Sequence, residues 1–402
     1  MHAIRAAHAF DGASFREGGA TVVVGDGLIV GVEDYGFPLP EDCPAVRFEG
    51  TLLPGLIDTH SHLVTDSGVA ALDRVAGYSD EEIDAVVSKA LRDQLVAGVT
   101  TVRDLGDRFF CVVERRDRQR GSAVVEPTIL ASGPPLTSRG GHCFFMGGEV
   151  SGSAEVDAAI AERVDRGVDV VKVMASGGVN TPGSDAMRTQ FTTEELRRIV
   201  DAAHGAGLPV TVHAHGTPAV EQALSVSPDG IEHCSCVTDR GLGQASEATV
   251  SALARSGIAV CPTMGVDPLA MKEPPPAIKA AMDRLGMTPA QWSRARADFT
   301  GRLHRAGVRL VAGLDSGIAP AKRHGLLPQE VCALVDAGLD VAEALGAATA
   351  VAADACGVGS DKGRLAPGLH ADLLVVDGDL ATNVTALFRP ETVWLRGTPV
   401  SP

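Results

Sequence analysis

Histidines, a lysine and an aspartate directly follow or interrupt short apolar runs along the middle of the chain. They are His60, His62, Lys172, His213, His215, His233 and Asp315. Neutral imidazoles and carboxylates are ligands that divalent cations such as zinc favour. The His60-x-His62 spacing would place both imidazoles on the same side of a strand, within reach of one ion. Together these residues predict a metal centre.

Each of these residues has a simpler interpretation when it is taken alone. A single histidine at a strand end is more typical of a hydrogen-bonded core residue than of a metal ligand. Lys172 lies within Val170-Val171-Lys172-Val173-Met174, where a buried charge is costly, and could extend its amine to solvent. Asp315 could be a helix N-cap. The functional interpretation depends on all of them meeting at one place.

The elements that would bring them together alternate between strands and helices. Five candidate strands follow helix-ending glycines, as at Ala97-Gly98 and Ala306-Gly307. Eight such β/α units fit a (β/α)8 TIM barrel, whose active site lies at the carboxyl ends of its strands. Residues 264–300 form a longer connection that could be a helical insertion or lid. The eight candidate strands are 55–58, 99–102, 128–131, 168–173, 209–213, 230–233, 258–261 and 308–312.

The two ends of the chain have a different pattern from the middle. Short β-type runs at 21–24 and 27–32 flank Gly25-Asp26, which is typical of a hairpin turn. Similar runs recur at 371–377 and 392–395. We therefore expect one small β-sandwich domain built from both termini, residues 1–53 and 362–402. The α/β barrel would lie between them, at residues 54–361.

Composition narrows the classes of partner. The 402 residues carry a net charge of −16, from 35 basic and 51 acidic side chains, which disfavours nucleic acid and anionic membranes as partners. Neither a signal peptide nor a membrane-spanning run is evident. The eight cysteines form no CxxC pair, which is typical of reduced thiols. We expect a cytoplasmic protein that acts on a small molecule.

Two segments resemble the amidohydrolase superfamily. Pro54-Gly55-Leu56-Ile57-Asp58-Thr59-His60-Ser61-His62 is similar to its first-strand signature, and 363–377 resembles its return into a terminal β-sandwich. The segments 172–178, 212–216 and 231–233 are closer to the imidazolonepropionase-like and prolidase-like branch, which includes Xaa-Pro dipeptidases and ochratoxin-type amidases. The resemblance covers nearly the whole chain.

The resemblance implies two divalent metal ions, with zinc favoured by the ligand types, and a role for each candidate ligand. His60, His62 and Asp315 would hold one ion, and His213 and His233 the other. A carbamate formed from CO2 and Lys172 would bridge the two ions. A metal-bridging hydroxide would then cut an amide or peptide bond, with Asp315 passing the proton to the leaving nitrogen. Members of this family commonly assemble as homo-oligomers.

The resemblance implies substrate contacts less directly. His142, in a Gly-Gly-His loop, and His215, which competes with His213 for one ligand role, would face the substrate. Arg188 and Arg323 could grip a substrate carboxylate, although each is more typical of a surface arginine. Relatives often carry an aromatic residue shortly after the sixth-strand histidine, where this chain has Cys234-Ser235-Cys236.

Several alternatives stay open at this point. A one-metal deaminase would usually lack Lys172 and carry an acidic residue soon after the fifth-strand histidine, where Gly216-Thr217-Pro218 stands here. A cyclic amide or imidazolone ring hydrolase, or a lactonase, would need the same centre as an amidase. A metal-free scaffold that only binds partners is disfavoured because every expected ligand is present.

Overall fold

Seven parallel strands in two sheets form the middle of the protein. The computed structural model describes residues 1–120, 125–181, 183–271 and 273–400. One sheet has the order β6-β7-β8 and the other β12-β11-β10-β9. The strands are β6 (Leu56–Ser61), β7 (Val99–Asp104), β8 (Thr128–Ala131), β9 (Val171–Met174), β10 (Val210–Gly216), β11 (Gly230–Val237) and β12 (Ala259–Cys261). Seven of the eight predicted strands are therefore present near their expected positions.

The eighth predicted strand, at residues 308–312, is not a regular strand, so that prediction was wrong. Its one bridge within the described residues is an isolated parallel pairing of Leu310 with Val260 of β12. Soon after it, Asp315 has a φ of 66°, which interrupts an extended backbone. The segment nevertheless connects the two sheets, because a further parallel bridge joins Ser316 to Ser61 of β6.

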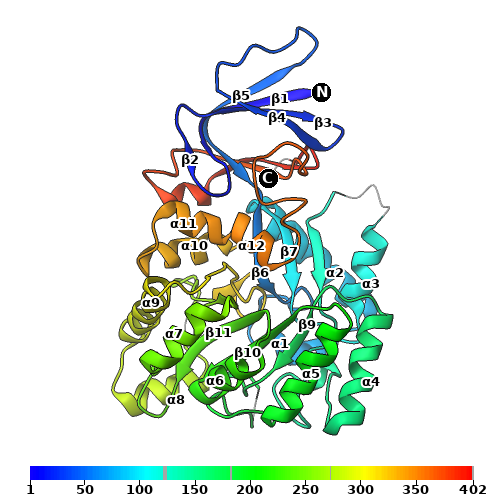
Figure 1. The fold of residues 1–402 in the computed structure, drawn as a ribbon, viewed down its shortest axis with the longest axis vertical. Helices are drawn as coiled ribbons and strands as arrows, with labels where there is room; N and C mark the ends of the chain where they lie inside the picture. Colours follow the sequence, from blue (N-terminus) through cyan, green and yellow to red (C-terminus); the bar gives the residue numbers. More distant parts are fainter. Residues whose placement is uncertain (121–124, 182, 272, 401–402) are drawn as a thin grey trace.

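Helices separate the strands and cover them (Figure 1). Four of them begin with the reciprocal side-chain cap of a capping box, including α5, where Thr192 and Glu195 pair. The five predicted helix-ending glycines, Gly98, Gly167, Gly207, Gly257 and Gly307, all have positive φ. The helices are α1 (Ala71–Val75), α2 (Asp80–Val96), α3 (Cys111–Gln119), α4 (Gly152–Asp165), α5 (Thr193–Gly205), α6 (Thr217–Val226), α7 (Glu247–Ser256), α8 (Pro276–Leu285), α9 (Pro289–Arg305), α10 (Leu327–Asp336), α11 (Val341–Ala347) and α12 (Ala350–Ala355), with 3-10 turns η1 (Phe144–Met146), η2 (Pro320–Lys322) and η3 (Val384–Phe388).

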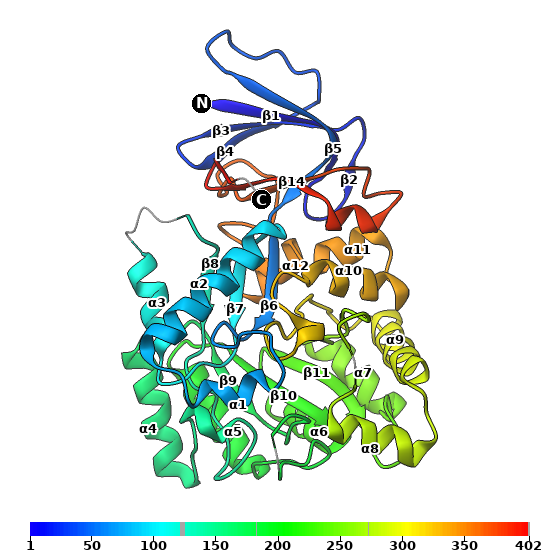
Figure 2. The ribbon, with the colours of Figure 1, turned by 180° about the vertical axis from the view of Figure 1, so that it is seen from behind.

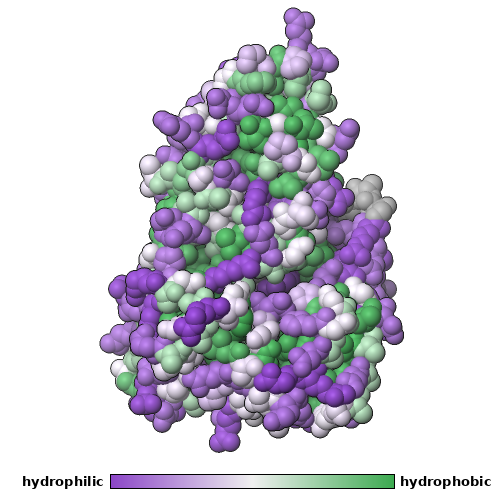
Figure 3. Space-filling model, in the orientation of Figure 1, coloured by the Kyte–Doolittle hydropathy of each residue, from purple (hydrophilic) through white to green (hydrophobic). Residues whose placement is uncertain are grey.

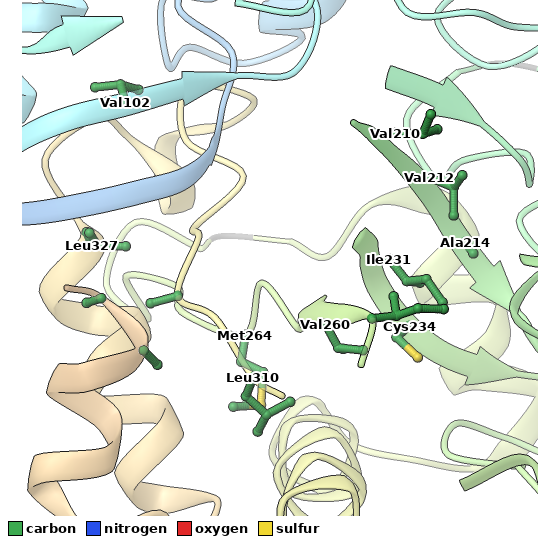
Figure 4. Packing of buried hydrophobic residues seen from close by; sticks show 14 of the residues in the cluster. Val102, Val210, Val212, Ala214, Ile231, Cys234, Val260, Met264, Leu310 and Leu327 are labelled. Carbon is green, nitrogen blue, oxygen red and sulfur yellow. The ribbon is translucent and has the colours of Figure 1, made fainter. Parts of the chain in front are cut away.

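The strands separate apolar from polar side chains by alternation. Val210, Val212 and Ala214 of β10 belong to the main hydrophobic core, together with Ile231 of the neighbouring strand β11 (Figure 4). Successive side chains of a strand point to opposite faces, so the residues between them face the other way. The candidate ligand His213 is one of those residues. The same alternation therefore builds the core on one face and the candidate site on the other.

Both termini contribute to one eight-stranded sheet, which lies at one end of the molecule (Figures 1 and 2). Its order is β15-β14-β13-β5-β1-β3-β4, with β2 paired to β1. The predicted hairpin is β3 and β4, which pair antiparallel. The strands are β1 (His2–Phe10), β2 (Phe15–Arg16), β3 (Ala20–Gly25), β4 (Leu28–Glu33), β5 (Ala45–Pro54), β13 (Leu373–Val376), β14 (Pro390–Leu395) and β15 (Thr398–Val400).

A single glycine joins this terminal sheet to the central strands. β5 ends at Pro54 and β6 begins at Leu56, so the chain runs from one sheet directly into the other. A Cβ on Gly55 would lie 2.2 Å from the hydroxyl oxygen of Thr100 in β7. Only glycine therefore permits this close approach. It fixes where β6 starts, and hence where its two histidines lie.

The insertion predicted at 264–300 contains α8 and the first part of α9, both of which lie at the edge of the molecule (Figure 2). Hydrophilic residues dominate the surface over the helices, whereas hydrophobic residues gather over the terminal sheet (Figure 3).

Among the described residues, no helix combines the length and the apolar character needed to span a membrane.

Candidate metal centre

Two histidines and an aspartate form the first group of candidate ligands. His60 and His62 each place Nε2 close to the same carboxylate oxygen, Oδ1 of Asp315, at 3.3 and 3.1 Å. All three residues are buried. The strand spacing predicted that the two imidazoles share one side, and their contacts with one oxygen agree with this. The group is suited to a single divalent cation.

Three histidines form the second group. His213 and His215 of β10 and His233 of β11 offer ligand nitrogens within 4.8 Å of one another. The rings of His215 and His233 stack with centroids 4.3 Å apart, and the ring of His213 lies 4.6 Å from that of His233. The structure thus brings both competing histidines of β10 to the group. The loop residue His142 lies beside them, with its ring 4.8 Å from that of His213.

Lys172 has a buried amine for which the described residues provide no hydrogen-bond partner. Its side chain is 1% exposed, and burial lowers the pKa of the amine. Lys172 lies on β9 and pairs with Thr211 of the neighbouring strand β10. Thr211 precedes His213 by two residues on that strand. Burial and the nearby Lys172 charge also lower the pKa of His60 to about 4. Lys172 is therefore close to both groups of candidate ligands.

Glu232 is a functional residue that the sequence reasoning missed. It precedes His233 and is 1% exposed. Its carboxylate pairs with Nδ1 of His60 at 2.8 Å and accepts hydrogen bonds from Arg103 at 3.1 Å and Thr211 at 2.5 Å. Burial alone would raise the pKa of Glu232, but His60 and Arg103 hold it well below its usual range. Glu232 thus orients His60, leaving Nε2 of that ring for a cation.

We expect Glu232→Ala to destabilise the metal-free protein by about 3–5 kcal/mol, because it leaves Arg103 buried without its ionic partner. Metal affinity should fall about 10- to 100-fold, as is typical when a group that orients a ligand is removed. Urea unfolding and metal titration would measure the two effects. Asp84→Ala is the control, since it removes an exposed ion pair with Arg118 and should cost about 1 kcal/mol or less. Equal effects of both substitutions would contradict the role of Glu232.

Asp58 holds the first strand against the segment that carries Asp315. Its carboxylate accepts hydrogen bonds from the hydroxyl of Ser316 at 2.7 Å and from the backbone of Leu314 at 3.2 Å. A third comes from the backbone N–H of His60 at 3.2 Å. One buried carboxylate therefore fixes the position of two candidate ligands. Its place in the apolar run before His60 gave no sign of this role.

Left-handed backbone conformations occur at several residues of the site. His233 and Asp315 have φ values of 67° and 66°, and Thr263 has 50°. Such values are uncommon outside glycine and cluster at functional sites. The conformation at His233 lets two consecutive residues, Glu232 and His233, both reach the site. Thr263 holds His233 in place through a hydrogen bond of 2.8 Å between its hydroxyl and Nδ1.

The remaining candidates have simpler environments. Cys143, Cys234, Cys236 and Cys261 are buried, as expected for small hydrophobic side chains, and all eight cysteines are free. Cys261 also lies within 4.8 Å of the ligand atoms of His60 and Glu232. Arg188 and Arg323 form exposed ion pairs with Asp185 and Asp267. The structure therefore places both arginines as ordinary surface residues.

The histidine groups predict a loss of stability in acid. Burial lowers the pKa of His142 to about 4 and that of His215 to about 3, whereas an unfolded histidine titrates near ~6.5. Between these values the unfolded chain binds more protons, so the free energy of unfolding falls as the pH drops from about 6.5 to 4. Denaturant unfolding of the metal-free protein against pH would measure this. His142→Asn should flatten the slope, and a stability that does not fall over that range would contradict the expectation.

Comparison with known proteins identifies the chain as a hydrolase that acts on carbon–nitrogen bonds. The chain belongs to the amidohydrolase family, whose pattern matches residues 51–400. It is 26% identical to ochratoxinase of Aspergillus niger over 382 residues, which cover 85% of this chain and 73% of that protein. It is 25% identical to imidazolonepropionase of Salinispora arenicola over 406 residues, 94% and 90% of the two chains.

The similarity of fold extends over the whole molecule. The structure superposes on the crystal structure of a Xaa-Pro dipeptidase with bound methionine in its active site, with a TM-score of 0.85 over 100% of both chains. The sequences are 23% identical, so this likeness concerns the fold. The resemblance to the superfamily and to its ochratoxinase, prolidase and imidazolonepropionase branch is thereby confirmed.

Proposed function

We propose that this protein is a binuclear metal-dependent amidohydrolase that cleaves the amide bond of an N-acyl amino acid or a dipeptide-like substrate. The observation that carries the proposal is the meeting of two ligand groups beside the amine of Lys172, which has no hydrogen-bond partner among the described residues. We further propose that the two parallel sheets and the segment at 308–316 form a (β/α)8 barrel over residues 54–361. The terminal eight-stranded sheet would correspond to the family's β-sandwich.

The side chains fit a pair of divalent cations with zinc-type preferences. His60, His62 and Asp315 would hold one ion and His213 and His233 the other, because both sets are buried and present imidazole or carboxylate donors. The neutral imidazoles that metal binding requires are favoured by burial, which lowers the pKa of His213 and His233 well below the usual value. When bound, such ions polarise a carbonyl and acidify water.

Lys172 would be carboxylated. Burial favours its neutral amine, which is the form that adds to CO2, giving a carbamate and releasing one proton. The carbamate is an anion with two oxygens, and so could serve both ligand groups at once. This modification would also give the amine the polar partners that it lacks among the described residues.

Asp315 would move the proton during hydrolysis. Burial alone would raise the pKa of Asp315, but His60, His62 and Lys322 lower it below its usual range, so its carboxylate is ionised near neutral pH. An ionised carboxylate can accept a proton from water and pass it to the leaving nitrogen. Asp315 also has a left-handed backbone, with a φ of 66°, of the kind that clusters at functional sites.

His142 and His215 would bind the substrate. His142 is held by a hydrogen bond of 2.7 Å between Nδ1 and the hydroxyl of Thr181, whereas the one described hydrogen-bonding neighbour of Nε2 is the thiol of Cys143, at 3.7 Å, a weak partner that a ligand could replace. His215 is held in a similar way by Ser235 at 3.0 Å. Burial lowers the pKa of both residues, so they would act as neutral hydrogen-bonding groups.

Cyclic amides are the second candidate substrate class, because ring opening of an imidazolone needs the same centre. The identity with imidazolonepropionase supports this alternative. Lactone hydrolysis is a weaker candidate and a metal-free scaffold the weakest. We also propose that the protein is a homo-oligomer and that it is cytoplasmic. The eight free cysteines support the cytoplasmic location.

Metal analysis and substrate screening together test the proposal. We expect about two divalent ions per chain by elemental analysis, and turnover within a panel of N-acyl amino acids and dipeptides. Cyclic amides and lactones belong in the same panel. Turnover of lactones alone would contradict an amidase, and a protein that stays metal-free and inactive after purification with added zinc would overturn the proposal.

A further inference from the structure

A half-buried arginine on helix α9 reaches from the insertion toward the site. Arg296 donates hydrogen bonds from Nη2 to the backbone oxygens of Pro262, at 3.1 Å, and Thr263, at 2.8 Å. These two bonds fix the guanidinium to the loop that follows β12. No sequence pattern distinguishes Arg296 from the other arginines of this helix.

The guanidinium keeps unused hydrogen-bond donors. Its Nε and Nη1 atoms have no hydrogen-bond partner in the described part of the chain. None of the described carboxylates lies within 4.0 Å of it, although Glu330 and Asp315 are near enough to oppose the lowering of its pKa by burial. A cation in such surroundings gains from an anionic partner.

The neighbouring cation Lys322 is different in this respect. Its amine donates to the backbone oxygens of Thr263, Gly265 and Leu314, at 2.8, 3.1 and 2.7 Å, so all three of its protons are used. Lys322 therefore holds two loops together and has nothing left for a ligand. Of the two cations that share the Thr263 oxygen, only Arg296 can bind a further group.

Short contacts place Arg296 beside the second ligand group. The oxygen that it binds belongs to Thr263, whose hydroxyl holds His233, and His233 stacks on His215. The charge of Arg296 contributes, after burial and His142, to the low pKa of His215. Arg296 is thus at the edge of the candidate centre, on the side of the second ligand group.

We propose that Arg296 binds a carboxylate of the substrate, on the side of the scissile bond that carries the leaving nitrogen. This inference rests on the proposed function and narrows its substrate class to amides of amino acids with a free carboxylate. The side of the bond follows from Asp315, the proposed proton donor to the nitrogen. Lys322 links the two residues, because it binds both the Thr263 oxygen that Arg296 binds and the oxygen of Leu314, which precedes Asp315. The insertion that supplies α9 would then select substrates as well as cover the site.

Binding of uncleavable analogues tests this inference separately from turnover. The probes are N-methylsulfonyl derivatives of alanine, phenylalanine and proline, each as the free acid and as its C-terminal amide, titrated calorimetrically into the metal-loaded protein. We expect at least one acid to bind about 10- to 100-fold more tightly than its amide, as for a charge-assisted hydrogen bond. Arg296→Met should remove that preference, and Arg296→Lys should restore part of it.

Arg302→Met is the matched control, because Arg302 lies on the same helix and also donates to a backbone oxygen, that of Ala245 at 3.0 Å. It should keep the preference for the acid. The inference is overturned if no acid is preferred by the unaltered protein, or if Arg296→Met keeps the preference. If the unaltered protein prefers the acids but hydrolyses none of the amides, the proposed function is overturned and the carboxylate site remains supported.

Discussion

Lys172→Ala is expected to abolish both the second metal ion and detectable turnover. The amine is buried, has no described hydrogen-bond partner and lies beside both ligand groups, so its carbamate would be the one ligand common to the two ions. Alanine cannot react with CO2, and a centre without its bridging anion would bring two cations together unshielded. Elemental analysis and turnover of the best amide substrate would measure the two losses.

A second measurement separates the carbamate from a purely structural role of the lysine. Protein exchanged into ¹³C-labelled bicarbonate should show a carbamate carbon signal by NMR, and Lys172→Ala should lack it. Short carboxylic acids supplied to that variant should restore part of the activity, because they can occupy the space that the side chain leaves. Full activity with one ion in the variant would refute the bridging role of Lys172.

Asp315→Asn is expected to keep substantial metal and to lose turnover by ~10²-fold or more, as is typical of a removed proton-transfer group. Asparagine has nearly the same shape and tolerates the left-handed backbone found at this position, with φ of 66°. It can also still present an oxygen to His60 and His62, but it cannot accept the proton. Metal content and kcat, measured on the same preparation, would distinguish these functions.

Asp267→Asn is the matched control for this substitution. Asp267 is a half-buried carboxylate that pairs with Arg323 at 3.7 Å and accepts a hydrogen bond from the backbone of Leu269, which asparagine can also accept. We expect the substitution to change turnover by less than about twofold, because the ion pair is partly exposed. Turnover by Asp315→Asn at the level of the unaltered enzyme would remove Asp315 from the mechanism. A complete loss of metal would show instead that its main contribution is as a ligand.

The sequence by itself determined the central strands and the main set of candidate ligands. Alternating apolar runs and helix-ending glycines have a direct physical cause in the pleat of a strand and in the left-handed end of a helix. Seven of the predicted strands and all five of these glycines agree with the structure. Because parallel strands end at the same edge of their sheet, the residues that follow them could be expected to meet.

Only the tertiary structure decided how those residues are held. Glu232 of one sheet orients His60 of the other. Asp58 ties the strand of His60 to the segment that carries Asp315. Arg296 reaches the site from an insertion. Each contact joins residues that are distant along the chain, so no local pattern contains it. The left-handed backbone at His233 is also a tertiary outcome, since local preference opposes it and the surrounding hydrogen bonds maintain it.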